Sequence, residues 1–78
     1  MKHFSNNIKS FRVAKDLSLR ETAYLVGITH LYLERIEKGE AIPPEGVVRN
    51  LAKVLGVNAE NLLQLCHEQH VAKNSPRS

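Results

Sequence analysis

Residues 30–38 carry basic, acidic and apolar side chains at helical spacing. If Leu33 faces inward, an advance of about 100° per residue places Ile36 and Glu37 on the same side. The side chains that then point outward are one apolar, one acidic and two basic: Leu31, Glu34, Arg35 and Lys38. This mixture is suited to reading a polar surface with small apolar groups on it.

The edges of DNA bases are such a surface. Arg35 can donate two hydrogen bonds to guanine O6 and N7, Glu34 can accept one from cytosine N4, and Leu31 can pack on a thymine methyl. His30 lies at the helix edge, where it can reach a base, a phosphate or a sugar. The alternative interpretation is an ordinary solvent-exposed helix face, which composition alone favours.

Cys66, His67 and His70 form a second group of residues that could bind a metal or act as a nucleophile. Cys66 and His70 share a helix face at i, i+4, whereas His67 lies about 100° away from Cys66. Zinc needs four ligands, or three and a water, and no second Cys/His pair is present. Periodicity places Cys66 in the core, where a nucleophile would lack access and an orienting partner. We therefore expect no metal, no cofactor and no enzymatic activity.

The outward residues need a short helix that is fixed by its neighbours. Helical periodicity runs from Ser5 to Asp16, and Ser18 with Glu21 has the spacing of a capping box for a helix from Leu19 to Gly27. Thr29 can cap the next helix, which ends near Gly39. Two helices joined by a three-residue turn containing glycine meet steeply, as in a helix-turn-helix.

Two further helices complete the predicted fold. Pro43-Pro44 precedes an apolar segment that ends at Gly56, and this fourth helix should be the central core element. Asn58 can cap a fifth helix with Leu62, Leu65 and Cys66 on one face. We expect one all-α, five-helix domain over residues 1–72 and a flexible tail over residues 73–78.

Charge and composition narrow the class of partner. The 78 residues carry a net charge of +3. Residues 1–39 contain seven basic and four acidic side chains, whereas residues 40–78 contain four of each, so an anionic partner should meet the first half. One cysteine permits no intrachain disulfide, and no apolar run approaches the ~20 residues of a membrane span. We expect a cytoplasmic protein that uses neither a membrane nor a small-molecule ligand.

Several blocks of the sequence resemble the Cro/C1-type, or Xre, helix-turn-helix family. The blocks are Leu17–Ala23, Gly27–Thr29, Tyr32–Gly39, Pro43-Pro44 and Leu51–Val57. The match covers about Ile8 to Cys66. It implies a compact five-helix, lambda-repressor-like domain whose third helix lies in the DNA major groove, usually as a homodimer. The chain departs from the family pattern at Leu19, where glutamine is usual, and at Glu34, where a small polar residue is usual.

The resemblance also implies roles for individual residues. Arg12 and Glu37 occupy the positions of a buried ion pair, so Arg12 is expected to be structural. Phosphate contacts are expected at the start of the second helix and around both ends of the third. The residues expected to make them are Leu19 through its amide, Arg20, Thr29, Tyr32, Lys38 and Gly39. For Arg20, the equal alternative is an ordinary solvent-exposed arginine.

One recognition helix reads only a few base pairs, so we expect a homodimer on a palindromic operator with its third helices about 34 Å apart. Leu63 leaves an apolar flank on the fifth helix beside His67 and His70, and we predict the dimer contact there. The alternative is that Leu63 completes the monomer core. The sequence thus predicts a repressor-like transcriptional regulator, and the alternative function is a protein-interaction module of the same fold with weak or lost DNA binding.

Overall fold

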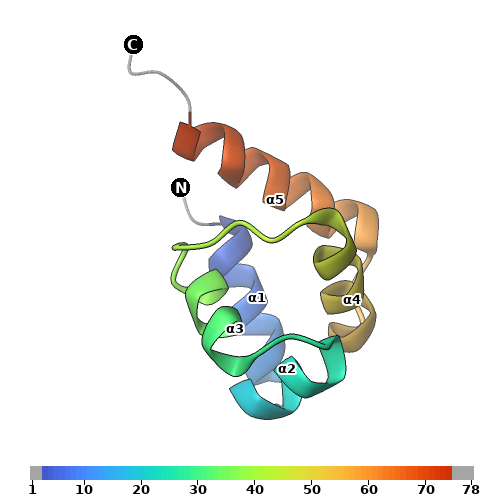
Figure 1. Ribbon diagram of the computed structural model, residues 1–78. Helices are drawn as coiled ribbons and strands as arrows, with labels where there is room; N and C mark the ends of the chain where they lie inside the picture. The colour runs from blue at the N-terminus through green and yellow to red at the C-terminus, as the bar shows by residue number, and fades with distance from the viewer. Residues whose placement is uncertain (1–2, 75–78) are drawn as a thin grey trace.

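A computed structural model describes residues 3–74 of the chain, with side chains over residues 4–70 (Figure 1). These residues form five α-helices and no strand: α1 (His3–Ala14), α2 (Leu19–Val26), α3 (His30–Glu37), α4 (Glu45–Leu55) and α5 (Ala59–Asn74). The all-α, five-helix prediction is confirmed. In Figure 1, α5 crosses one end of the molecule and α2 lies at the opposite end.

Two glycines that were predicted to end helices do so in the structure. Gly27 follows α2 with φ 93°, and its N–H donates to the carbonyl of Ala23 at 2.8 Å. Gly56 follows α4 in the same way with φ 72°. These left-handed conformations favour glycine because it has no Cβ to clash with the backbone.

The bounds of α1 differ from the sequence prediction at both ends. The helix begins at His3, before the predicted Ser5, because Phe4 and Ser5 are fully buried in the core. It ends at Ala14, before the predicted Asp16, in a Schellman turn: Leu17 N–H donates to the Arg12 carbonyl at 3.1 Å. Asp16 occupies the left-handed position of this turn with φ 60°.

The core is shared between α1 and α4. Helix α4 packs against α1, α2 and α5, and α1 packs against α3, α4 and α5. Helix α4 was predicted to be the central core element, and among the described residues it buries four hydrophobic side chains against two from α1. The fully buried aliphatic side chains come from four helices: Ile8, Leu33, Ile36, Val48, Leu51 and Leu62.

Helix α5 carries its predicted cap and core face. Asn58 Oδ1 accepts a hydrogen bond from Asn61 N–H at 2.9 Å, and Leu62 and Cys66 are buried, with Leu65 half-buried. The helix continues to Asn74, so it includes Lys73 and Asn74, the first residues of the expected tail. Nothing in the sequence between Gly56 and Pro76 breaks a helix. The rest of that tail, residues 75–78, lies outside the described residues.

A buried polar contact joins the start of α1 to α5. Gln69 Oε1 accepts hydrogen bonds from both the N–H and the hydroxyl of Ser5, each at 3.1 Å. Gln69 Nε2 is buried and has no hydrogen-bond partner within the described part of the chain. Within residues 3–74, no helix is long and apolar enough to cross a bilayer.

Candidate nucleic-acid interface

The turn between α2 and α3 is short and closed by local hydrogen bonds. Gly27 ends α2, and Thr29 caps α3 by accepting a hydrogen bond from Tyr32 N–H at 3.1 Å through its hydroxyl oxygen. The Thr29 hydroxyl proton remains available for an external acceptor such as a phosphate. The two helices pack directly on each other, which fixes the orientation of α3.

Helix α3 has the buried and exposed faces that its periodicity predicted. Leu33 and Ile36 are fully buried and attach the helix to the core. The predicted outward residues are exposed or half-buried: Leu31, Glu34, Arg35 and Lys38. His30 and Tyr32 are half-buried at the edges, and Tyr32 also packs against the core. The helix therefore presents a mixed polar and apolar surface to solvent.

Two of the outward residues contact each other. The Lys38 ammonium lies 3.4 Å from a carboxylate oxygen of Glu34, one helical turn away. A solvent-exposed pair at this spacing contributes only about 0.3–0.5 kcal/mol. Glu34 and Lys38 can therefore separate at little cost when another charged or hydrogen-bonding group approaches.

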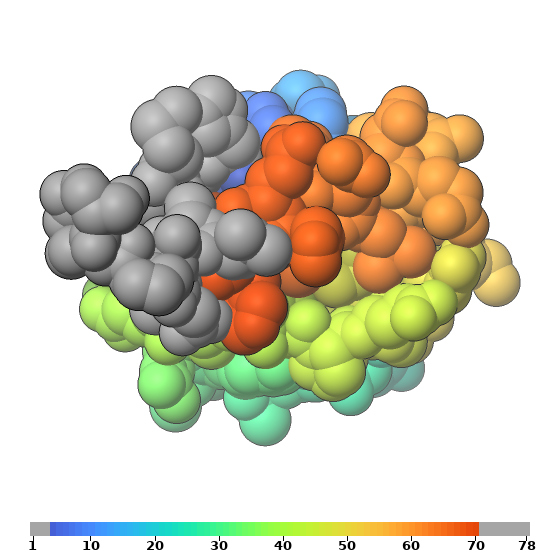
Figure 2. Space-filling view, turned by 90° about the horizontal axis from the view of Figure 1, so that it is seen from above, coloured from blue at the N-terminus to red at the C-terminus, as the bar shows by residue number. Residues whose placement is uncertain are grey.

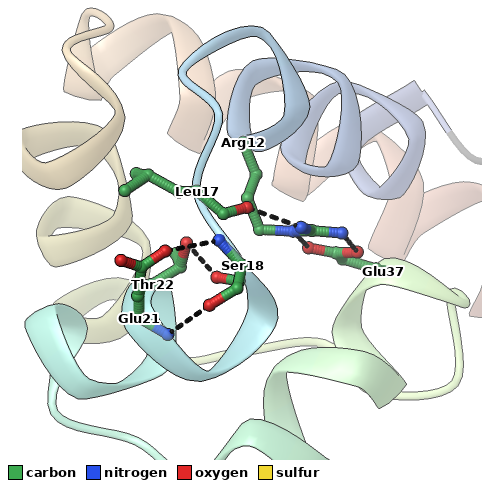
Figure 3. A network of polar contacts seen from close by, with 6 residues as sticks. All are labelled: Arg12, Leu17, Ser18, Glu21, Thr22 and Glu37. Carbon is green, nitrogen blue, oxygen red and sulfur yellow. Dashed lines mark hydrogen bonds and ion pairs between the residues drawn. The ribbon is translucent and has the colours of Figure 1, made fainter.

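The C-terminal end of α3 is attached to α1 by the ion pair of Arg12 and Glu37 (Figure 3). Arg12 Nε donates to Glu37 Oε2 at 2.7 Å and Nη2 donates to Oε1 at 3.0 Å, while Nη1 donates to the Leu17 carbonyl at 2.8 Å. The two side chains are only 11% and 7% exposed. Arg12 thus makes the pair that the resemblance implied, and its guanidinium is directed inside the protein.

The hydrogen bond to Glu37 raises the pKa of Arg12, and this effect exceeds the opposing effect of burial. Arg12 is therefore a permanent cation, and the Glu37 carboxylate compensates its charge. A buried pair with this two-fold hydrogen bonding is intact only while both partners are present. The position of α3 consequently depends on a residue of α1.

The start of α2 is closed by the predicted capping box, which Figure 3 also shows. Ser18 Oγ accepts from Glu21 N–H at 3.0 Å, and Glu21 Oε1 accepts from Ser18 N–H at 3.0 Å. The bond from the Ser18 backbone lowers the pKa of Glu21. The N–H groups of Leu19 and Arg20 precede the first N–H that donates within the helix, that of Thr22 to the Ser18 carbonyl, so they suit an external anion.

The residues predicted to contact phosphates differ in their solvent exposure. Arg20 and Lys38 are exposed, whereas the Leu19 side chain packs against the core and leaves only its amide for this role. Gly39 is half-buried, and its N–H already donates to the Ile36 carbonyl at 3.1 Å.

Tyr24 is the surface residue that the sequence analysis missed. It is the most exposed large hydrophobic side chain in the described region, and it lines a pocket between α2 and α3 together with Arg20, His30 and Leu31. The inward side of α2 is formed by Thr22, Ala23 and Val26. A helical projection of residues 19–26 places Tyr24 on the opposite side only once the burial of these three residues is known.

The predicted dimer flank lies along α5, beside the loop that leads into α4. Leu63 is half-buried, and His67 and His70 are exposed. These residues line an apolar pocket with Ile42, Pro43, Glu45, Val48 and Cys66. Figure 2 shows α5 running next to the segment around residues 40–45. Ile42 and Pro43 of this lining belong to the loop that joins α3 to α4, and no residue of α3 lines the pocket.

Cys66, His67 and His70 were considered as a metal-ligating group in the sequence. Within the described residues, no three His, Cys, Asp or Glu side chains come together in a way that could coordinate an ion. Cys66 is buried, and burial raises the pKa of its thiol, which favours the unreactive protonated form.

A family model described as a helix-turn-helix domain matches residues 3–65 of the chain. The matched region contains α1 to α4 and the first part of α5, and it includes the turn between α2 and α3. No curated protein matches the sequence.

Proposed function

The chain belongs to the helix-turn-helix domain family, and on that basis we propose that it is a sequence-specific DNA-binding transcriptional regulator of the repressor type. It binds a palindromic operator as a homodimer and reads the major groove with α3. A regulator of this type, whether bacterial, phage or mobile-element, would work in the cytoplasm.

The observation that carries this proposal is the division of α3 into an anchored and an exposed face. Leu33 and Ile36 attach the helix to the core, and Glu37 attaches it to Arg12. The opposite face is left with side chains that have defined partners on base edges. We assign base contacts to His30, Leu31, Glu34 and Arg35.

The phosphate contacts would flank this face. Arg20 and the amides at the start of α2 would contact phosphates on one side of the groove. Lys38 and the backbone near Gly39 would contact phosphates beside the α3–α4 loop. Thr29 and Tyr32 contribute at the first turn of α3. Because the Gly39 N–H is already donated to Ile36, its contribution comes from the close approach that a residue without a side chain allows.

The second copy would dock along α5. The apolar pocket between α5 and the α3–α4 loop supports this, because no residue of α3 lines it and docking there would leave the exposed face of α3 uncovered. Leu63 would be the central apolar contact, with His67 and His70 at its edge. Two recognition helices could then enter successive major grooves.

A second candidate function is a protein-interaction module of the same fold. It is favoured by the exposed apolar side chains Tyr24 and Leu31 and by the mutual neutralisation of Glu34 and Lys38. The two candidates differ in how their binding depends on salt, because phosphate contacts release counterions from DNA.

A selection from a random duplex library, followed by a salt titration on the selected sequence, tests the proposal. We expect a palindromic consensus and an affinity that falls steeply between 50 and 200 mM salt. A protein that retains no duplex at 50 mM salt would not be a DNA-binding regulator, and the interaction module would then be the better assignment.

A further inference from the structure

An exposed pocket lies between α2 and α3 on the side where α3 begins. It is lined by Arg20, Ala23, Tyr24, Ile28, Thr29, His30 and Leu31. Tyr24 is 84% exposed and Leu31 is 62% exposed, so two large apolar side chains stand on the same pocket without a covering element. Side chains of this size at one concave site indicate a contact surface.

The charges around the pocket favour an anionic occupant. None of the lining residues just named is acidic, and Arg20 stands at the first turn of α2. The N-terminus of α3 opens onto the same site through Thr29, His30 and Leu31, and helix N-termini carry partial positive charge. The occupant should therefore combine negative charge with a small apolar group.

A thymidine nucleotide in the major groove has both properties. Its 5-methyl is the apolar group that a base pair presents in that groove, and its phosphate lies at the groove wall. We propose that Tyr24 and Leu31 together receive the 5-methyl group of one thymine in each half-site, with Arg20 on a neighbouring phosphate. Tyr24 is thus a specificity-determining residue. This inference rests on the proposed DNA-binding function.

Replacing single thymines by deoxyuridine in the selected duplex tests the inference, because this change removes only the methyl group. We expect one thymine per half-site at which the replacement lowers affinity about fourfold, the factor that corresponds to one buried methyl. Conversely, replacing a cytosine by 5-methylcytosine at other positions should have no such effect.

Three variants assign the effect to the pocket. Tyr24→Ala and Leu31→Ala should bind thymine and deoxyuridine duplexes equally, whereas Tyr24→Phe should retain the wild-type preference. Leu25→Ala is the matched control, since Leu25 is 56% exposed on the same helix but lines a separate depression with Asn50, Lys53 and Val54. It should retain the preference. Circular dichroism should show the same helicity for all four variants.

The outcomes separate the inference from the proposed function. If the wild-type protein binds the selected duplex equally well whichever thymine is replaced by deoxyuridine, the inference is wrong and the DNA-binding function still stands. Tyr24→Ala with an intact thymine preference also overturns it. A protein that retains no duplex at 50 mM salt overturns both the inference and the DNA-binding function.

Discussion

Arg12 and Glu37 connect the last turn of α1 to the last turn of α3 through two parallel hydrogen bonds of 2.7 and 3.0 Å. The two residues are 25 positions apart in the sequence. The helix whose exposed face is proposed to read DNA is therefore fixed at its C-terminal end by a charge on another helix. Its N-terminal end is fixed by the Thr29 cap.

The first prediction concerns this ion pair. Arg12→Met and Glu37→Leu should each lower the free energy of unfolding by about 3–5 kcal/mol, because each leaves an uncompensated buried charge. The double variant should lose less than the sum, although the Leu17 carbonyl would still lack its donor. Urea unfolding of the four proteins measures these values. Strictly additive losses would mean that the two side chains act independently.

The second prediction separates base readout from phosphate contact. Arg35→Ala should weaken operator binding and relax the preference at one position per half-site by about 1–3 kcal/mol. Lys38→Ala should weaken binding to all sequences similarly and reduce the salt slope by about one unit. Fluorescence anisotropy on consensus and single-mismatch duplexes measures both effects. An unchanged consensus for Arg35→Ala would remove Arg35 from the base contacts.

The third prediction concerns the dimer. Leu63→Glu places a charge in the apolar pocket beside α5, so the proposed self-association should be lost while helicity is retained. Operator affinity should fall strongly, because one half-site then binds alone. Sedimentation velocity of wild type and variant gives the oligomeric state. A Leu63→Glu protein that still sediments as a dimer would place the interface elsewhere.

The fourth prediction concerns the end of α1. Asp16 has φ 60°, a conformation that costs non-glycine residues roughly 1–2 kcal/mol, and its acid follows the negative end of a helix. Asp16→Gly should therefore stabilise the domain by about 0.5–1 kcal/mol, after the greater entropy of glycine in the unfolded chain is included. Asp16→Ala is the control and should not stabilise. Thermal unfolding of the three proteins provides the comparison.

Signals that act over a few residues allowed most of the fold to be predicted. The Ser18 and Glu21 capping box, the Gly27 stop and the Thr29 cap depend only on their neighbours, and the structure contains all of them. The early start of α1 depends on α5, because Ser5 is buried against Gln69, 64 positions away. Local periodicity cannot contain that information.

The same distinction applies to the candidate site. The two faces of α3 follow from its own period once Leu33 is placed inward. Helix α2 reverses the usual pattern, since the polar Thr22 is buried and donates its hydroxyl to the Ser18 carbonyl at 2.9 Å, whereas the aromatic Tyr24 faces solvent. Hydrophobicity alone would place Tyr24 inside, so its exposure becomes visible only when the packing of α2 is known.

The contact between Ser5 and Gln69 has a consequence for the protein as it is synthesised. A ribosome adds about 5–20 residues per second, so Gln69 is polymerised several seconds after Ser5. During that interval, the first turn of α1 lacks the helix that covers it in the finished fold, and the apolar Phe4 next to Ser5 cannot reach its native environment. Phe4 and Ser5 are thus made well before the helix that covers them, and a nascent chain stalled before Gln69 would leave them without their native contacts.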